Sequence, residues 1–133
     1  MSDGKVETLR AVIEAVNRRD LDALSKLLAP DVEIVPIRAA VEGNTAYAGQ
    51  DAAAEWLAAL DDSWATMTAA VERFRDGGNC VLGVGRVRGC GRESGVQFDV
   101  EAAAVARFRG GRVTYLHLST DVAKAIDEAG LSE

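Results

Sequence analysis

The first half of the chain carries apolar residues at helical spacing. Residues 4–18 predict an amphipathic helix, whose apolar stripe consists of Val6, Leu9, Val12, Ile13 and Val16. Asp20 stands where the N-cap of a second, short helix belongs, and Pro30 prevents that helix from continuing. Residues 51–60 predict a third helix, with the same spacing at Ala53, Trp56, Leu57 and Leu60.

Between and after these helices the pattern changes to that of strands. Residues 31–38 are rich in β-branched side chains and predict a strand that is covered on both faces. Glycine-rich turns then separate four longer predicted strands, at residues 66–75, 80–88, 96–108 and 112–120. A closing helix is expected at residues 121–129, with Asp121 at its N-terminus and Gly130 at its C-cap.

This order of elements predicts one α+β domain over residues 1–133. A chain of 133 residues has the usual length of a single domain and is long enough to bury a sizeable core. The four long strands form an antiparallel meander. Three or four helices on one side of a curved antiparallel sheet would cover its apolar face.

The charge balance narrows the classes of partner. The chain has 15 Lys and Arg against 21 Asp and Glu, a formal net charge of −6, which argues against nucleic-acid binding. No apolar stretch approaches the roughly 20 residues that span a bilayer, so no membrane partner is expected. The first residues lack the basic and apolar regions of a signal peptide, which predicts a cytoplasmic protein.

The composition offers few ligands for a metal or a nucleotide cofactor. Cys80 and Cys90 lie at the two ends of one predicted strand, about 33 Å apart, and are expected to be free thiols. With one histidine and no second cysteine pair, a metal site has too few ligands. The Gly83-Val84-Gly85 run lacks the strand-then-helix context of a nucleotide loop. No metal and no cofactor are therefore expected.

Several sequence segments carry a resemblance to a known family. The element order resembles the nuclear transport factor 2-like superfamily. The segments that match its SnoaL-like branch are residues 17–24 leading into 28–33, Tyr47-x-Gly49, Trp56, Trp64, residues 86–96, residues 108–113, and Asp121 ahead of Ala129-Gly130-Leu131. Relatives include ketosteroid isomerases, limonene epoxide hydrolases and SnoaL-like polyketide cyclases. The resemblance implies a cone-shaped sheet, a pocket for a small organic ligand, and a homodimer formed through the outer sheet face.

Catalytic residues of the relatives carry over only in part. The base and the two oxyanion donors of ketosteroid isomerase fall on Val35, Val12 and Ala104, which are apolar, so proton abstraction of that kind is excluded. The epoxide hydrolase pattern keeps an arginine at Arg86 and an aspartate at Asp121, but its middle aspartate is replaced by Arg88. The resemblance to the cyclases also implies Asp121 as an acid or base.

These matches define the predicted site. Arg86 and Arg88 are two residues apart on one strand and must share a face, and the same holds for His117, Ser119 and Asp121 on the last strand. If the resemblance has the side right, all five point into the cone. The predicted catalytic residues are then Asp121, Arg86 and His117, and the predicted ligand-binding residues are Arg88, Ser119, Trp56, Tyr47 and Arg38.

Each of these residues also has a structural interpretation. Arg86 and Asp121 could form a buried ion pair, His117 could be a core residue, and the aromatic residues could fill the core. Two functions therefore stay open at this point. One is a cofactor-independent isomerase, cyclase or hydrolase, and the other is a non-catalytic protein for ligand binding or assembly. They differ in whether Asp121 and Arg86 meet at the floor of an accessible pocket.

Overall fold

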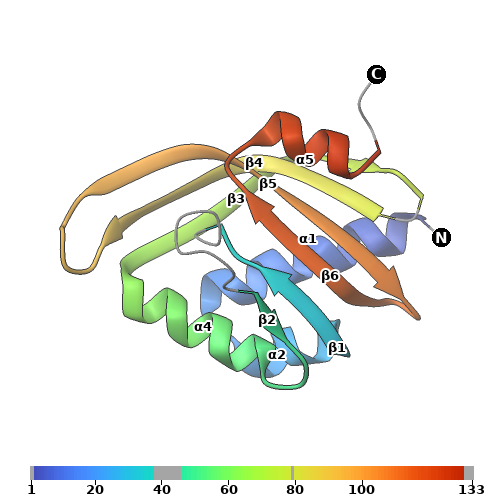
Figure 1. Ribbon diagram of the computed structural model, residues 1–133, viewed down its shortest axis with the longest axis horizontal. Helices are drawn as coiled ribbons and strands as arrows, with labels where there is room; N and C mark the ends of the chain where they lie inside the picture. Colours follow the sequence, from blue (N-terminus) through green and yellow to red (C-terminus); the bar gives the residue numbers. More distant parts are fainter. Residues whose placement is uncertain (1, 38–45, 79, 131–133) are drawn as a thin grey trace.

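A computed structural model describes residues 2–37, 46–78 and 80–130, and the elements follow the predicted order (Figure 1). The helices are α1 (Ser2–Arg18), α2 (Leu21–Leu27), α4 (Ala52–Ser63) and α5 (Val122–Glu128). The strands are β1 (Leu28–Val35), β2 (Tyr47–Ala48), β3 (Trp64–Asp76), β4 (Cys80–Gly91), β5 (Gln97–Arg109) and β6 (Arg112–Ser119). No helix in the described ranges is long and apolar enough to cross a membrane.

The strands form one mixed sheet in the order β2-β1-β6-β5-β4-β3. All neighbouring pairs are antiparallel except β1 and β6, which run parallel with Val35 beside His117. The predicted α+β class with a curved sheet is confirmed. The parallel pair arises because the chain, after leaving the sheet edge for α4 and the meander, returns to lie beside β1.

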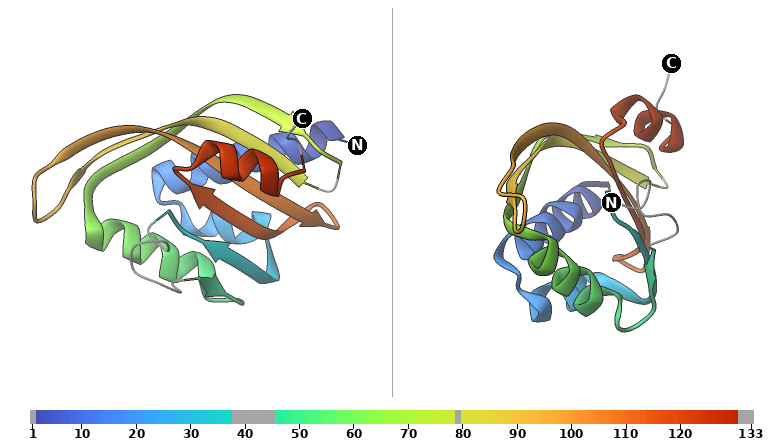
Figure 2. Two further views of the ribbon diagram at one scale, coloured as in Figure 1. Left: turned by 45° about the horizontal axis from the view of Figure 1, so that its top comes forward. Right: turned by 60° about the vertical axis from the view of Figure 1, so that its left-hand side comes forward.

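Three of the four helices in the described ranges cover the concave face of the sheet. The curved sheet wraps around α1 and α4, while α5 lies outside the curve (Figure 2). The main core lies between the concave face and these helices, and its fully enclosed side chains include Leu9, Val12, Leu24, Ile34 and Leu116. A second, smaller core lies under α5 on the convex face and includes Leu82, Val84, Val105 and Ala125.

Local signals explain how the N-terminal helices are placed. Asp20 caps α2, because its side chain accepts a hydrogen bond from the Ala23 N–H at 3.1 Å. Arg19, just before it, has a φ of 54° and turns the chain between the two helices. Near the end of α1, the Asn17 side chain pairs with the Ala69 backbone through two hydrogen bonds of 2.8 Å. These contacts fix α1 across β3.

The strong bend of the sheet depends on two glycines of β4. At Gly85, an added Cβ atom would lie 1.9 Å from the Ala70 carbonyl oxygen of β3. At Gly89, it would lie 2.2 Å from the Thr66 carbonyl oxygen and 2.9 Å from the Phe98 ring. The pairing of β3 with β4 also shifts register between Val71 and Arg73. Only glycine permits this close approach of the two backbones.

The bend gives the first testable prediction. Gly85→Ala should lower the free energy of unfolding by at least about 2 kcal/mol, because the methyl group forces β3 and β4 apart. Gly4→Ala is the matched control, since a Cβ atom there meets nothing within 4 Å and alanine favours a helix. Urea unfolding measures both. Equal stability of the Gly85→Ala variant and the wild type would contradict this account of the bend.

Candidate functional site

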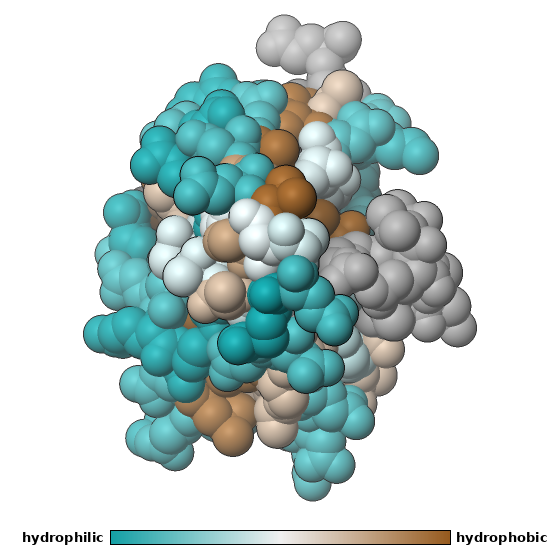
Figure 3. Space-filling model, turned by 90° about the vertical axis from the view of Figure 1, so that its left-hand side faces the viewer, coloured by the Kyte–Doolittle hydropathy of each residue, from teal (hydrophilic) through white to brown (hydrophobic). Residues whose placement is uncertain are grey.

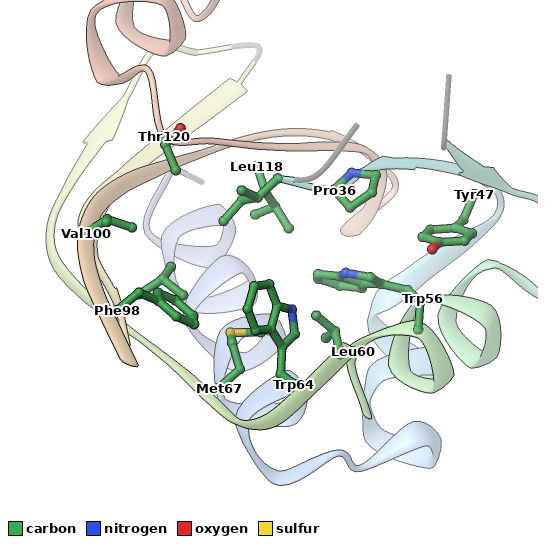
Figure 4. A pocket seen from close by; sticks show the side chains of 13 residues that line it. Pro36, Tyr47, Trp56, Leu60, Trp64, Met67, Phe98, Val100, Leu118 and Thr120 are labelled. Carbon is green, nitrogen blue, oxygen red and sulfur yellow. The ribbon is translucent and has the colours of Figure 1, made fainter. Parts of the chain in front are cut away.

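A pocket opens between α4 and the concave face of the sheet. Its volume is about 390 Å³, which is in the range of small-molecule sites. Side chains from α4, from strands β2 to β6 and from the residues that follow β1 line it (Figure 4). They are Pro36, Ile37, Tyr47, Trp56, Ala59, Leu60, Trp64, Met67, Val87, Phe98, Val100, Leu118 and Thr120.

Aromatic rings make up much of the pocket wall. Both tryptophans of the chain line it, and Trp56 is only 2% exposed. The rings of Trp64 and Phe98 face each other with centroids 4.8 Å apart and planes tilted by 52°. The Phe98 ring lies against Gly89, where a side chain would displace it. The bend at β4 therefore also positions this wall.

Polar atoms in the pocket are few. The lining residues with polar side-chain atoms are Tyr47, Thr120 and the two tryptophans, and none of the described lining residues is charged. Charged groups are expensive to bury without a partner. The described part of the pocket therefore suits an uncharged, largely apolar molecule.

Arg92 braces the pocket wall from the tip of the β4–β5 hairpin. Its guanidinium donates hydrogen bonds to the carbonyl oxygens of Asp61, at 2.8 Å, and Trp64, at 3.3 Å. A cation at the C-terminal end of α4 also interacts favourably with the helix dipole. The Asp61 side chain is held in turn by Arg19 at 3.0 Å. These contacts join the hairpin to the end of α4, next to the Trp64–Phe98 pair.

The hairpin end of the molecule shows apolar surface between hydrophilic flanks (Figure 3). Val96, beyond the end of β4, is 63% exposed, and Val100, which lines the pocket, is 39% exposed.

Arg86 and Arg88 lie on the opposite face of the sheet from the pocket. Val87, between them, lines the pocket, so strand alternation turns both arginines outward. On the outer face the Arg86 and Arg88 Nε atoms contact the Asp99 carboxylate at 2.7 and 3.2 Å. The expectation that they point into the cone is wrong. The two-residue spacing predicts only that Arg86 and Arg88 share a face of the sheet. That this face is the inner one was inferred from the family resemblance.

The same correction applies to the last strand. Leu118 lines the pocket, so His117 and Ser119 face outward, and His117 Nδ1 lies 2.6 Å from Glu128 Oε1 of α5. Asp121 is the N-cap of α5, and its side chain accepts from the Lys124 N–H at 3.1 Å. The structure thus gives Arg86, His117 and Asp121 separate contacts on the outer side, and their catalytic roles stay predictions.

Two of the predicted ligand-binding residues do lie at the pocket. Tyr47 and Trp56 line it, and their ligand-binding role stays a prediction. Arg38 falls outside the described residues. Phe98 and Met67 were missed. Strand alternation offered a signal for Phe98, which shares a face with Val100, whereas Met67 is three residues from Trp64 and the pairing of β3 with β4 shifts register between Trp64 and Thr66. The described ranges contain no group of three or more His, Cys, Asp or Glu side chains that could hold a metal.

Ionisable groups cluster instead where α5 meets the outer face. Tyr115 donates a hydrogen bond to Glu128 Oε2 at 2.8 Å, and the Arg107 guanidinium lies over the Tyr115 ring. Burial, followed by this hydrogen bond to a carboxylate, raises the pKa of Tyr115 to about 12. For Glu128, burial raises the pKa, but hydrogen bonds from Tyr115 and His117 outweigh it and leave the pKa below its usual value.

The fold and the pocket define a class of protein built as a curved sheet that wraps around helices and leaves a cavity on its concave face. Residues 9–116 match the SnoaL-like domain family, and the chain belongs to that family. The predicted resemblance is thereby confirmed. No curated protein sequence is significantly similar to this chain.

Solved structures show the same fold. An NTF2-like protein of unknown function from Burkholderia pseudomallei superimposes with a TM-score of 0.78 at 26% identity, over 93% of this chain and 95% of that one. TerC, co-crystallised with polyporic acid, gives a TM-score of 0.77 at 20% identity, over 96% and 98%. A ketosteroid isomerase-like fold from Catenulispora acidiphila, in complex with trimethylamine, gives 0.75 at 21% identity, over 95% and 94%.

The Tyr115–Glu128 contact predicts a pH effect on stability. The folded protein favours neutral Tyr115, because its pKa rises from 10.0 to about 12. The resulting stabilisation is complete below pH 10 and is lost as the pH rises towards 12. Tyr115→Phe should therefore lose less stability than wild type between pH 9 and pH 11.5 in urea unfolding. Tyr47→Phe, which leaves this contact intact, should follow wild type, and parallel curves for all three proteins would contradict the assignment.

Proposed function

We propose that this SnoaL-like protein binds a small, uncharged, aromatic molecule inside its cone. The observation that carries the proposal is the pocket of about 390 Å³ with Trp56, Trp64 and Phe98 in its wall. Flat rings stack well on such side chains and gain from burial of their apolar area. A volume of this size suits a molecule of two or three fused or linked rings.

The charges of the pocket wall and of the whole chain both favour an uncharged ligand. The described lining residues supply no cation for an anionic ligand and no carboxylate for a cationic one. The chain as a whole carries a net charge of −6, which further disfavours anions.

Binding without acid–base catalysis is the form of the proposal that the described residues support. A general acid or base must reach the group whose proton it moves. Asp121, Arg86 and His117 are engaged on the outer side of the sheet, away from the lining of the pocket.

A pair of fluorescent molecules tests the proposal. N-phenyl-1-naphthylamine is neutral, and 8-anilinonaphthalene-1-sulfonate has the same ring framework with a negative charge. The neutral molecule should bind at least tenfold more tightly. It should also quench tryptophan emission, because both tryptophans of the chain line the pocket.

Two alanines of α4 supply matched variants. Ala59 lines the pocket, whereas Ala58 is exposed on the same helix. Ala59→Phe should weaken binding of the neutral molecule at least tenfold by filling the pocket, and Ala58→Phe should bind as wild type does. Binding to wild type and both variants with equal affinity would place the ligand elsewhere and refute the proposal.

We also propose that the outer face of β3, β4 and β5 joins two copies of the chain. This face carries cations and anions side by side, with Arg88 69% and Asp99 48% exposed at the side chain. Glu101 pairs in register with Arg86 on the same face. A surface that bears both signs can meet itself across a twofold axis.

Sedimentation equilibrium tests the pairing of two copies. Wild type should be a dimer at micromolar concentration, and Arg88→Glu should shift it towards monomer, because the reversal brings like charges together. Lys26→Glu on α2 reverses a charge away from this face and should leave the dimer intact. A monomeric wild type at 100 µM would rule out the interface.

A further inference from the structure

The pocket wall holds a hydrogen-bond donor that the described residues leave unpaired. Trp56 is 2% exposed, and its indole N–H has no hydrogen-bond partner in the described part of the chain. No fully enclosed side-chain nitrogen or oxygen of the described residues lacks a partner, so this nitrogen must open onto the pocket. An indole nitrogen donates a hydrogen bond and cannot accept one.

A second unpaired donor lies at the same end of the pocket. The Tyr47 hydroxyl has no hydrogen bond within the described residues, whereas the hydroxyl of the other tyrosine, Tyr115, is engaged by Glu128. In Figure 4 the Tyr47 hydroxyl oxygen lies on the side of its ring that faces Trp56. β2 and α4 thus present one donor each to the same region.

From these two donors we infer that Tyr47 and Trp56 form a subsite for a carbonyl oxygen of the aromatic ligand. The inference rests on the proposed function and specifies the chemistry of the ligand. A ligand that covers such a donor without pairing it removes the donor from water at a cost, so a ligand that accepts its hydrogen bond is favoured over one that does not. A carbonyl oxygen has two lone pairs and carries no charge, so it can accept from both donors.

Other ligand groups fit this end of the pocket less well. A hydrocarbon leaves the Trp56 N–H without a partner. A carboxylate brings a charge into a wall where the described residues supply no cation. An ammonium group presents only donors to the indole N–H. The ligand class is therefore a neutral aromatic ketone, quinone or amide.

Two molecules of equal shape test the subsite. In 2-acetylnaphthalene a carbonyl oxygen occupies the place that a methylene group takes in 2-isopropenylnaphthalene. Wild type should bind the ketone about fivefold to tenfold more tightly than the alkene, measured by quenching of tryptophan emission. Tyr47→Phe should remove most of this preference by weakening the ketone alone. Tyr115→Phe, on the outer face, should keep the full preference.

A second variant and a second readout keep the subsite testable even if one variant folds poorly. Trp56→Phe keeps an aromatic ring but removes the N–H, and Trp64 remains to report binding. It too should lose preference for the ketone. The infrared carbonyl stretch of bound 2-acetylnaphthalene should lie at lower frequency in wild type than in Tyr47→Phe, which a merely structural role of Tyr47 would not produce.

The outcomes separate the two proposals. If wild type binds both molecules equally and neither variant changes that, the subsite is wrong while the pocket proposal stands. If wild type binds neither molecule, nor the neutral naphthylamine, the pocket proposal fails and the subsite fails with it. A ketone preference that both variants lose supports the subsite.

Discussion

The close approach of β3 to β4 is the constraint on which the rest of the structure depends. Because Gly85 and Gly89 have no side chains, the backbone oxygens of Ala70 and Thr66 come within distances that a Cβ atom would forbid. This contact bends the long strands around α1 and α4, so the concave face encloses a volume that the helices fill only in part. The same bend leaves room for the Phe98 ring against Gly89, and Phe98 then pairs with Trp64.

Apolar side chains line the inner face of the sheet at the pocket, and charged side chains lie on its outer face. Alternate residues of β4 and β5 place Val87 and Val100 in the pocket and Arg86, Arg88 and Asp99 outside. The paired charges hold the pKa of Asp99 below its usual value, first through the hydrogen bond from Arg86. The outer face thereby keeps its ions near water, where they cost little to accommodate, and the inner face stays suited to an uncharged ligand.

Periodicity predicted most of the fold because the helical stripe of α1, the Asp20 cap and the glycine-rich turns are local signals. Two features were beyond it: β1 lies parallel to β6, and α5 packs on the convex face, since both depend on contacts distant in sequence. For the site, spacing showed that Arg86 and Arg88 share a face but not which face. Tyr47 and Trp56 were placed at the pocket, whereas Phe98 and Met67 become visible only once the inner face of the sheet is known.

The central claim is that the ligand binds among the aromatic side chains inside the cone and not among the polar residues outside it. A ¹⁵N-labelled sample gives two indole N–H resonances, one for each tryptophan, and both tryptophans line the pocket. On titration with N-phenyl-1-naphthylamine, both indole resonances should shift, while the backbone amides of Arg88, His117 and Asp121 stay in place. Shifts at those three amides with unchanged indole resonances would contradict the account.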